Sequence, residues 1–118
     1  MEFAESFERL NITQQSRELA NAVYDAMGIC SDFDFRNQIQ AAAVSVTNNI
    51  AEGFERRTKK DSSHFLDQSK GSAGEVRSTL HLAEDRKYIP RATTLDLRTR
   101  YSRLPGSIGA LASKLRNP

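Results

Sequence analysis

The sequence predicts an all-α protein: a single domain, residues 1–118, folded as an antiparallel up-down-up-down four-helix bundle. Two observations predict this class. Apolar residues recur at intervals of three and four positions in four successive segments, which is the spacing of one face of an α-helix. A chain of 118 residues is one domain by length, and it can bury roughly two thirds of the surface that its unfolded form exposes.

The first helix is expected to start near Asn11 and to end at Gly28, because glycine commonly follows the last turn of a helix. After a short loop, Ser31 and Asp34 have the spacing of a capping box, with the acid in place of the commoner Glu or Gln. The second helix then runs to about Glu55. The core-facing residues of the first helix are Ile12, Ser16, Leu19, Ala20, Val23 and Met27.

The middle of the second helix is uncharged on both of its faces. Residues 37–51 carry no charged side chain in a protein that is 27% charged, so this run must be buried. One face is apolar over an arc of about 120°, and the other holds small uncharged residues where a surface helix has Lys and Glu. We therefore expect a second subunit to cover that face, which makes the protein a homo-oligomer. The apolar face consists of Phe35, Ile39, Ala42, Ala43, Val46, Ile50, Gly53 and Phe54, and the expected oligomer interface of Ala41, Val44, Asn48, Ala51 and, from the third helix, Gly71.

A second capping box, Thr58 with Asp61, starts the third helix, and Pro90 is expected to end it. Gly71, in the interior of this helix, costs about 1 kcal/mol relative to alanine and lies off the apolar face. It therefore indicates a close contact outside the bundle core. The core-facing residues are Phe65, Leu66, Ser69, Ser72, Ala73, Val76, Leu80 and Ala83.

The fourth helix starts at a third capping box, Thr93 with Asp96. Pro105 removes a backbone donor and crowds the carbonyl of Tyr101, so we expect the helix to be kinked or split there. Its core-facing residues are Leu97, Tyr101, Leu104, Ile108, Leu111 and Leu115.

Charge is distributed unevenly along the chain. Residues 1–55 hold 3 Lys or Arg and 9 Asp or Glu, whereas residues 56–118 hold 14 and 6. The net charge of +2 thus combines an acidic first half with a basic second half. This asymmetry favours either an anionic partner or the pairing of acidic with basic helices inside the bundle.

Four cations fall within five residues at the turn between the second and third helices. Such cations repel one another unless an anion is present, and nucleic-acid phosphates provide one; the alternative is a solvated face. Because Phe54 and Phe65 belong to core-facing stripes, we expect no stacking platform for bases and no sequence-specific readout. The candidate nucleic-acid-binding residues are Arg56, Arg57, Lys59, Lys60, Lys70 and Arg77, with Arg91, Arg98, Arg100 and Arg103 as a second patch on the fourth helix.

The sequence offers little for enzymatic chemistry. His64 and His81 are 17 residues apart, and no His or Cys pair has the spacing of metal ligands, so we expect no metal and no cofactor. A glycine-rich phosphate loop and a nucleophile elbow are also missing from the sequence. We therefore predict that the protein is not an enzyme and infer no small-molecule substrate.

Glu52 and Glu75 are the carboxylates that an acid–base mechanism at a subunit junction would use. We favour a structural role instead. Asn49 and Glu52 lie one turn apart near the end of the second helix, where both can reach Arg56 or Arg57. A buried carboxylate is costly unless it is paired, and an arginine supplies the partner.

Several motifs occur in a characteristic order: Phe7-Glu8-x-Leu10-x-Ile12, Asn49-Ile50-Ala51-Glu52-Gly53-Phe54, Arg56-Arg57-x-Lys59-Lys60, Phe65-Leu66 and Lys70-Gly71-Ser72-x-x-Glu75. Together they resemble the small bacterial four-helix bundles called 23S rRNA intervening-sequence proteins, over roughly residues 7–89. The resemblance implies an antiparallel four-helix bundle, a ring-like homopentamer and no established enzymatic activity. It also implies a link to nucleic acid, by genomic association and by kinship with basic accessory proteins of diversity-generating retroelements. The motif residues given a structural role are Asn49, Glu52, Gly53, Phe65 and Glu75.

The sequence also predicts a cytoplasmic protein. Its start has neither the basic residues nor the apolar centre of a signal peptide, and no apolar run approaches the 18 or so residues of a membrane helix. The one cysteine, Cys30, agrees with a reducing compartment. We expect a non-enzymatic homo-oligomer that binds the RNA or DNA backbone or scaffolds a nucleic-acid-handling partner. The alternative is a purely structural or protein-binding oligomer with no nucleic-acid contact.

Overall fold

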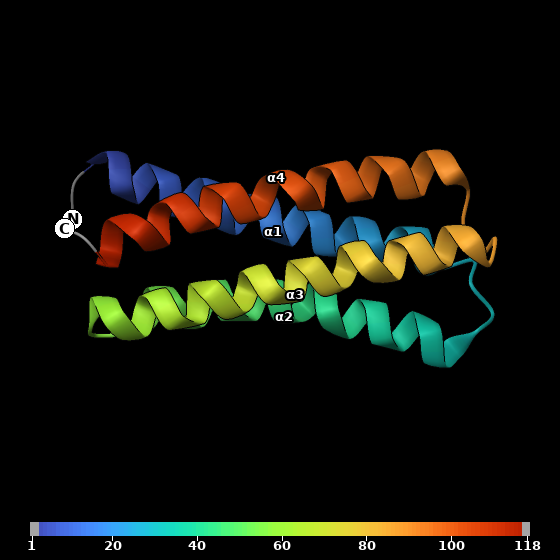
Figure 1. Cartoon of the computed structure of the whole chain (residues 1–118), viewed down its shortest axis with the longest axis horizontal. Helices are drawn as coiled ribbons and strands as arrows, with labels where there is room; N and C mark the ends of the chain where they lie inside the picture. The colour runs from blue at the N-terminus through green and yellow to red at the C-terminus, as the bar shows by residue number, and fades with distance from the viewer. Residues whose placement is uncertain (1–2, 117–118) are drawn as a thin grey trace.

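The computed structural model describes residues 3–116 as four α-helices (Figure 1). The helices are α1 (Phe3–Met27), α2 (Phe33–Glu55), α3 (Lys59–Asp85) and α4 (Arg91–Arg116). Consecutive helices are joined at alternate ends of a body that measures 45 × 22 × 18 Å, and they lie antiparallel (Figure 1). α1 and α3 each pack against both α2 and α4. The predicted all-α four-helix bundle is therefore confirmed.

The predicted apolar stripes meet in one core along the axis of the bundle. The largest side chains of this core, among them Met27, Ile39, Ile50 and Tyr101, are fully buried. Ala20, Phe35 and Phe54 are only partly buried and pack against the edge of this core. Phe65 and Ser72, which were also predicted to face the core, are likewise half-buried.

The first helix begins at Phe3, eight residues before the predicted start at Asn11. Phe7 and Leu10 of these early turns are 64% and 56% exposed, so they add little to the core. A tertiary contact accompanies these turns instead. Arg9 pairs with Glu5 one turn earlier at 2.9 Å, and its guanidinium lies 5.0 Å from the centre of the Phe54 ring on α2.

The second helix is capped by Asp32, not by Ser31 as predicted. The Asp32 carboxylate accepts hydrogen bonds from the Phe35 amide at 3.1 Å and from the Tyr88 hydroxyl at 2.7 Å. These two bonds, the one from Tyr88 first, hold the pKa of Asp32 below its ordinary value. Tyr88 belongs to the connection between α3 and α4. The capping residue Asp32 is therefore bound by a residue that is distant in sequence. The predicted end of α2 at Glu55 is confirmed.

The third helix starts as predicted, because the Thr58 hydroxyl accepts a hydrogen bond from the Asp61 amide at 3.1 Å. It ends at Asp85, well before Pro90, so the predicted end is wrong. Lys87 takes a left-handed backbone conformation with φ 59°, and the Tyr88 amide donates to the Ala83 carbonyl at 2.9 Å. This is a Schellman motif, which glycine usually forms and which the sequence therefore did not signal.

The fourth helix starts at Arg91, before the predicted cap at Thr93. The carbonyl of Pro90 accepts hydrogen bonds from the amides of Thr93 and Thr94, both at 3.1 Å, so Thr93 lies inside the first turn. The helix continues through Pro105 to Arg116 and is not split into two helices. A kink at Pro105 stays a prediction. Over residues 3–116, no helix has the length and apolar character needed to cross a membrane.

Gly53 is the point at which α2 and α3 approach each other most tightly among the glycines of the two helices. A Cβ atom at this position would lie 3.1 Å from the Ser62 backbone oxygen and 3.2 Å from the Leu66 side chain. A backbone oxygen in a helix cannot move away without disturbing its own hydrogen bond. The predicted structural role of Gly53 therefore has a steric cause.

Replacing Gly53 with alanine should destabilise the bundle. The added methyl group forces α2 and α3 apart, and overpacking of this kind costs about 1–3 kcal/mol, which opposes a gain of about 1 kcal/mol in helix propensity. Gly106→Ala is the matched control, because no atom lies within 4 Å of a Cβ there and it should gain stability. Urea denaturation of both variants measures the difference; equal stabilisation by the two would contradict the steric account.

Candidate nucleic-acid interface

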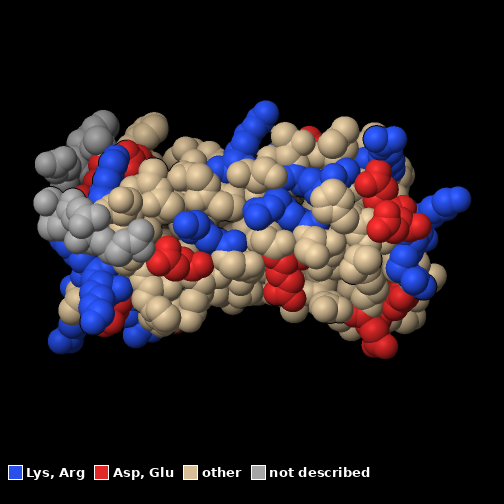
Figure 2. Space-filling model, viewed as in Figure 1, with Lys and Arg blue, Asp and Glu red and all other residues tan. Residues whose placement is uncertain are grey.

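The predicted basic cluster gathers at one end of the bundle because two helices end there. Arg56 caps α2, with its amide donating to the Gly53 carbonyl at 3.4 Å, and Lys59 and Lys60 open α3. All four cations of the turn, Arg57 included, are exposed. Figure 2 shows Lys and Arg side chains at this end, and a separate group along the face formed by α3 and α4.

Arg56 is the cation of the cluster that contacts other side chains of the protein. It forms the predicted ion pair with Glu52, one turn back on α2, and its guanidinium lies 4.4 Å from the centre of the Phe65 ring. The two charged side chains are 42% and 52% exposed, so the pair contributes at most about 1 kcal/mol. It is thus a surface tie and not the buried pair that was expected.

Asn49 does not reach the turn, contrary to the prediction. Its side-chain amide donates to the Ser45 carbonyl at 2.9 Å and to the Ser45 hydroxyl at 3.1 Å. That hydroxyl lies 2.8 Å from the hydroxyl of Ser72 on α3. Asn49 is therefore held by a polar contact between α2 and α3, about two turns before Arg56.

Arg57, Lys59 and Lys60 differ from Arg56. Their side chains make no hydrogen bond or ion pair with any residue in the described part of the chain. Their charges are consequently not neutralised by the bundle. Substituting them removes no internal contact.

Lys70 and Arg77 lie in the seam between α3 and α4, away from the turn. The Lys70 Nζ atom lies 3.3 Å from the position that a Cβ on Gly109 of α4 would take. Lys70 follows Lys59 by 11 residues, which is about 16 Å along a helix, and Arg77 lies about two turns further. The structure therefore does not bring these two predicted site residues together with the other four.

Arg77 has a structural partner that the sequence did not reveal. Its Nη1 atom donates a hydrogen bond to the Tyr101 carbonyl at 3.0 Å. In a regular helix that carbonyl would accept from the amide of residue 105, but Pro105 has no N–H. Arg77 thus supplies the donor that the proline lacks. The Tyr101 side chain points into the core, where burial raises the pKa of its hydroxyl.

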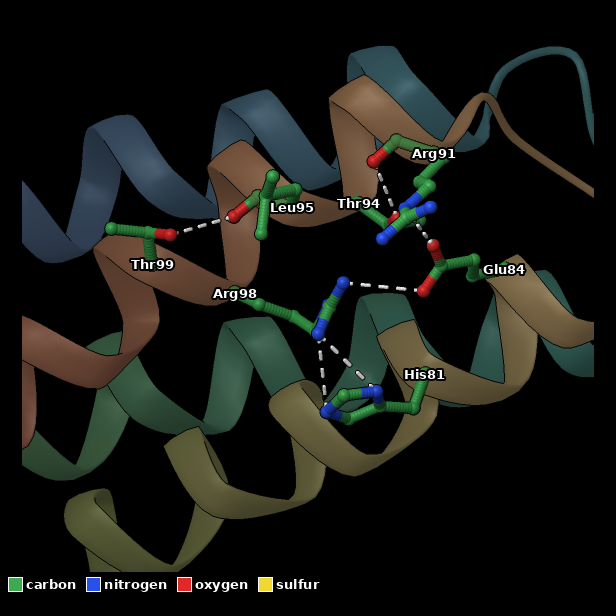
Figure 3. Close-up of polar contacts among 7 residues, drawn as sticks. All are labelled: His81, Glu84, Arg91, Thr94, Leu95, Arg98 and Thr99. Atoms are coloured by element: carbon green, nitrogen blue, oxygen red, sulfur yellow. Dashed lines mark hydrogen bonds and ion pairs between the residues drawn. The ribbon is translucent and has the colours of Figure 1, made fainter.

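Two residues of the second predicted patch on α4, Arg91 and Arg98, contact α3 (Figure 3). Glu84 accepts from both Arg91 and Arg98 at 3.2 Å, and Arg98 also lies 3.3 Å and 3.4 Å from the two ring nitrogens of His81. Arg100 lies 3.5 Å from Asp96, and Arg103 is exposed. Arg98 is only 18% exposed, so it holds α4 to α3 more than it presents charge to solvent.

The face predicted to be an oligomer interface is narrower than expected. Ala41, Asn48, Ala51 and Gly71 are exposed, and Val44 is half-buried. Two polar neighbours instead make contacts inside the bundle: Ser45 with Ser72, and Thr47, whose hydroxyl donates to the Ser16 carbonyl at 3.3 Å. A strip of small uncharged residues remains at the surface.

Glu52 and Glu75 do not share a site within one chain. Gly53, next to Glu52, contacts Ser62, and Glu75 lies 13 residues beyond Ser62, about 20 Å along α3. Glu75 is exposed, and its described hydrogen bond is through its backbone carbonyl, which accepts from Thr79 at 2.8 Å. Among the side chains that the structure describes, no group of three or more His, Cys, Asp or Glu residues is placed to hold a metal ion.

The fold and the cation-rich turn define the class as a small all-α four-helix bundle with a basic end. The chain belongs to the 23S rRNA-intervening sequence protein family, whose model matches residues 8–110. A solved structure with the same fold is a protein of unknown function from the S23 ribosomal protein family of Bacteroides thetaiotaomicron. It is 16% identical, with a TM-score of 0.83, and the match covers 90% of this chain and 98% of that one. No curated protein sequence matches the chain.

The bond between Arg77 and Tyr101 should depend on Pro105. Arg77→Met keeps an unbranched apolar stem and removes the donors of the side chain, so it should destabilise the protein by about 1.5–3 kcal/mol. In a Pro105→Ala background the alanine N–H can bond to the Tyr101 carbonyl. Arg77→Met should then reduce the free energy of unfolding by a smaller amount. A double-mutant cycle by urea denaturation measures the coupling. Additivity within about 0.5 kcal/mol would show that Arg77 does not substitute for the missing amide.

Proposed function

We propose that this protein binds RNA or DNA through phosphate contacts at the α2–α3 turn and catalyses no reaction. The observation that carries the proposal is the set of exposed cations Arg57, Lys59 and Lys60, which have no counter-ion among the described residues. Cations held this closely are stabilised by a polyanion, whose release of bound counter-ions drives association.

The aromatic residues near the turn support backbone binding without base readout. Phe54 lies under Arg9, and Phe65 lies under Arg56 and edge-on to His64. Both rings are half-buried, so neither offers a free face on which a base can stack. The name of the family refers to a 23S rRNA intervening sequence, which agrees with an RNA partner.

A second candidate function is that of a structural or protein-binding oligomer with no nucleic-acid contact. The strip formed by Ala41, Asn48, Ala51 and Gly71 favours self-association, because an exposed helix face ordinarily carries charged residues. We propose a homo-oligomer for either function, with the five subunits that the family resemblance implies. A measurement of nucleic-acid binding distinguishes the two functions.

Reversing the two lysines of the turn should weaken binding in a salt-dependent way. In Lys59→Glu/Lys60→Glu, the slope of log affinity against log salt should fall by about 1.4, since each contact with a single strand contributes about 0.7. The loss should be equal for unrelated sequences, because phosphate contacts carry no sequence information. Fluorescence titrations of RNA at several salt concentrations measure the slope.

The matched control is Arg17→Glu/Lys87→Glu, which changes the total charge equally at two exposed positions on other parts of the bundle. This control variant should keep most of the wild-type slope of log affinity against log salt. The melting temperature should be nearly unchanged in both variants. Wild-type protein that binds neither RNA nor DNA at low salt ends this proposal and favours the second candidate.

A charge on the uncharged strip should disrupt the oligomer. With subunits of 13.2 kDa, five of them give a mass of about 66 kDa by light scattering. Ala41→Glu, at an exposed position, should lower this mass because an unpaired charge is costly to bury in an interface. Ala92→Glu, an exposed alanine on α4, is the control and should leave the mass unchanged. A wild-type monomer at micromolar concentration would refute the proposal.

A further inference from the structure

A pocket of about 210 Å³ lies at the basic end of the bundle, beside the α2–α3 turn. Arg9 of α1 and Leu115 of α4 contribute to its walls together with the turn, so all four helices take part. Gly53, which has no side chain, lines it as well. The sequence did not reveal this pocket, because its walls come from residues far apart in the chain.

The pocket contains donors that the protein leaves unused. Ser62 is one of the residues that line the pocket and is 4% exposed, yet its hydroxyl is buried without a hydrogen-bond partner among the described residues. The Arg9 Nε atom is also buried without such a partner. Buried polar atoms of this kind are uncommon, since an unsatisfied donor costs about 1–3 kcal/mol. A bound ligand with oxygen acceptors would satisfy them.

The start of α3 adds to these donors. Thr58 already accepts from the amides of Asp61, at 3.1 Å, and Ser62, at 3.0 Å. The amides of Lys59 and Lys60, the first two of the helix, make no hydrogen bond with the described chain. Free amides at a helix N-terminus, together with the helix dipole, favour an anion.

The charge of the lining selects the same kind of ligand. Arg9, Arg56, Arg57 and Lys59 face one carboxylate, Glu5, which is occupied by its 2.9 Å pair with Arg9. The excess of positive charge and the unused donors are complementary to a compact anion with several oxygen atoms. Phosphate groups have this chemistry.

We propose that this pocket binds the terminal phosphomonoester of a nucleic-acid strand, with Ser62 donating from the floor and Arg57 and Lys59 neutralising its charge. The proposal rests on the backbone binding proposed above and names the part of the strand that is held most tightly. An internal phosphodiester continues into sugars on both sides and stays at the surface, whereas a terminal phosphate has one ester link and enters the pocket end-on. It also carries about −1.5 to −2 charges at pH 7 and three acceptor oxygens.

The test compares three RNAs of one sequence: one with a 5′-phosphate, one with a 3′-phosphate and one with hydroxyl groups at both ends. Wild-type protein should bind one phosphorylated form about tenfold more tightly than the hydroxyl form, the gain expected from one or two charge-assisted hydrogen bonds. The phosphorylated RNA that shows the higher affinity identifies which end of the strand is bound. Fluorescence anisotropy at fixed salt measures all three affinities.

Ser62→Ala separates binding from folding. Because the hydroxyl has no partner in the free protein, its removal should leave the melting temperature equal or higher. It should also abolish most of the preference for the phosphorylated end, with the affinity and salt slope of the hydroxyl RNA unchanged. Ser69→Ala is the control on the same helix: its hydroxyl donates to the Val46 carbonyl at 2.8 Å, so it should lower stability and keep the preference.

The outcomes distinguish the two proposals. Equal, salt-dependent binding of all three RNAs overturns the pocket proposal and leaves backbone binding at the turn in place. A preference that Ser62→Ala retains in full overturns the assignment to this pocket. Absence of binding to any of the three RNAs overturns both proposals.

Discussion

The contact between Gly53 and the first turn of α3 is the constraint on which the basic end of this bundle depends. Since no side chain separates the two helices there, the Ser62 backbone and Leu66 lie directly against α2. The chain therefore reverses within three residues, 56–58, and the cations on either side of the turn are forced together. The same approach leaves the Ser62 hydroxyl buried beside an open pocket.

Positive charge in the second half of the chain has two different uses. In the seam between α3 and α4, Arg77 bonds to the carbonyl left free by Pro105, and Arg98 joins Glu84 and His81. These arginines stabilise the packing of the two helices, because each joins a side chain of one helix to a polar group of the other. At the turn, Arg57 has no such group among the described residues. A count of charges does not distinguish the arginines that join helices from the cations at the turn. The contacts of each side chain distinguish them.

Membership of the 23S rRNA-intervening sequence protein family agrees with this fold but does not decide what the protein does. Four-helix bundles host many functions, so function has to be argued from a site. The site here consists of donors and charges at one end of the molecule that have no partner among the described residues. Their arrangement agrees with the anion-binding role proposed for them.

Sequence alone determined the features that local physics controls. The period of the apolar residues placed Ile50 and Tyr101 in the core, and Thr58 was recognised as a cap because its partner, Asp61, lies three residues away. Tertiary structure decided the rest: α1 extends to Phe3, and Asp32 replaces Ser31 as the cap of α2. Those features depend on partners in other helices or connections. Such partners are close in space but distant in sequence, so a local sequence pattern does not reveal them.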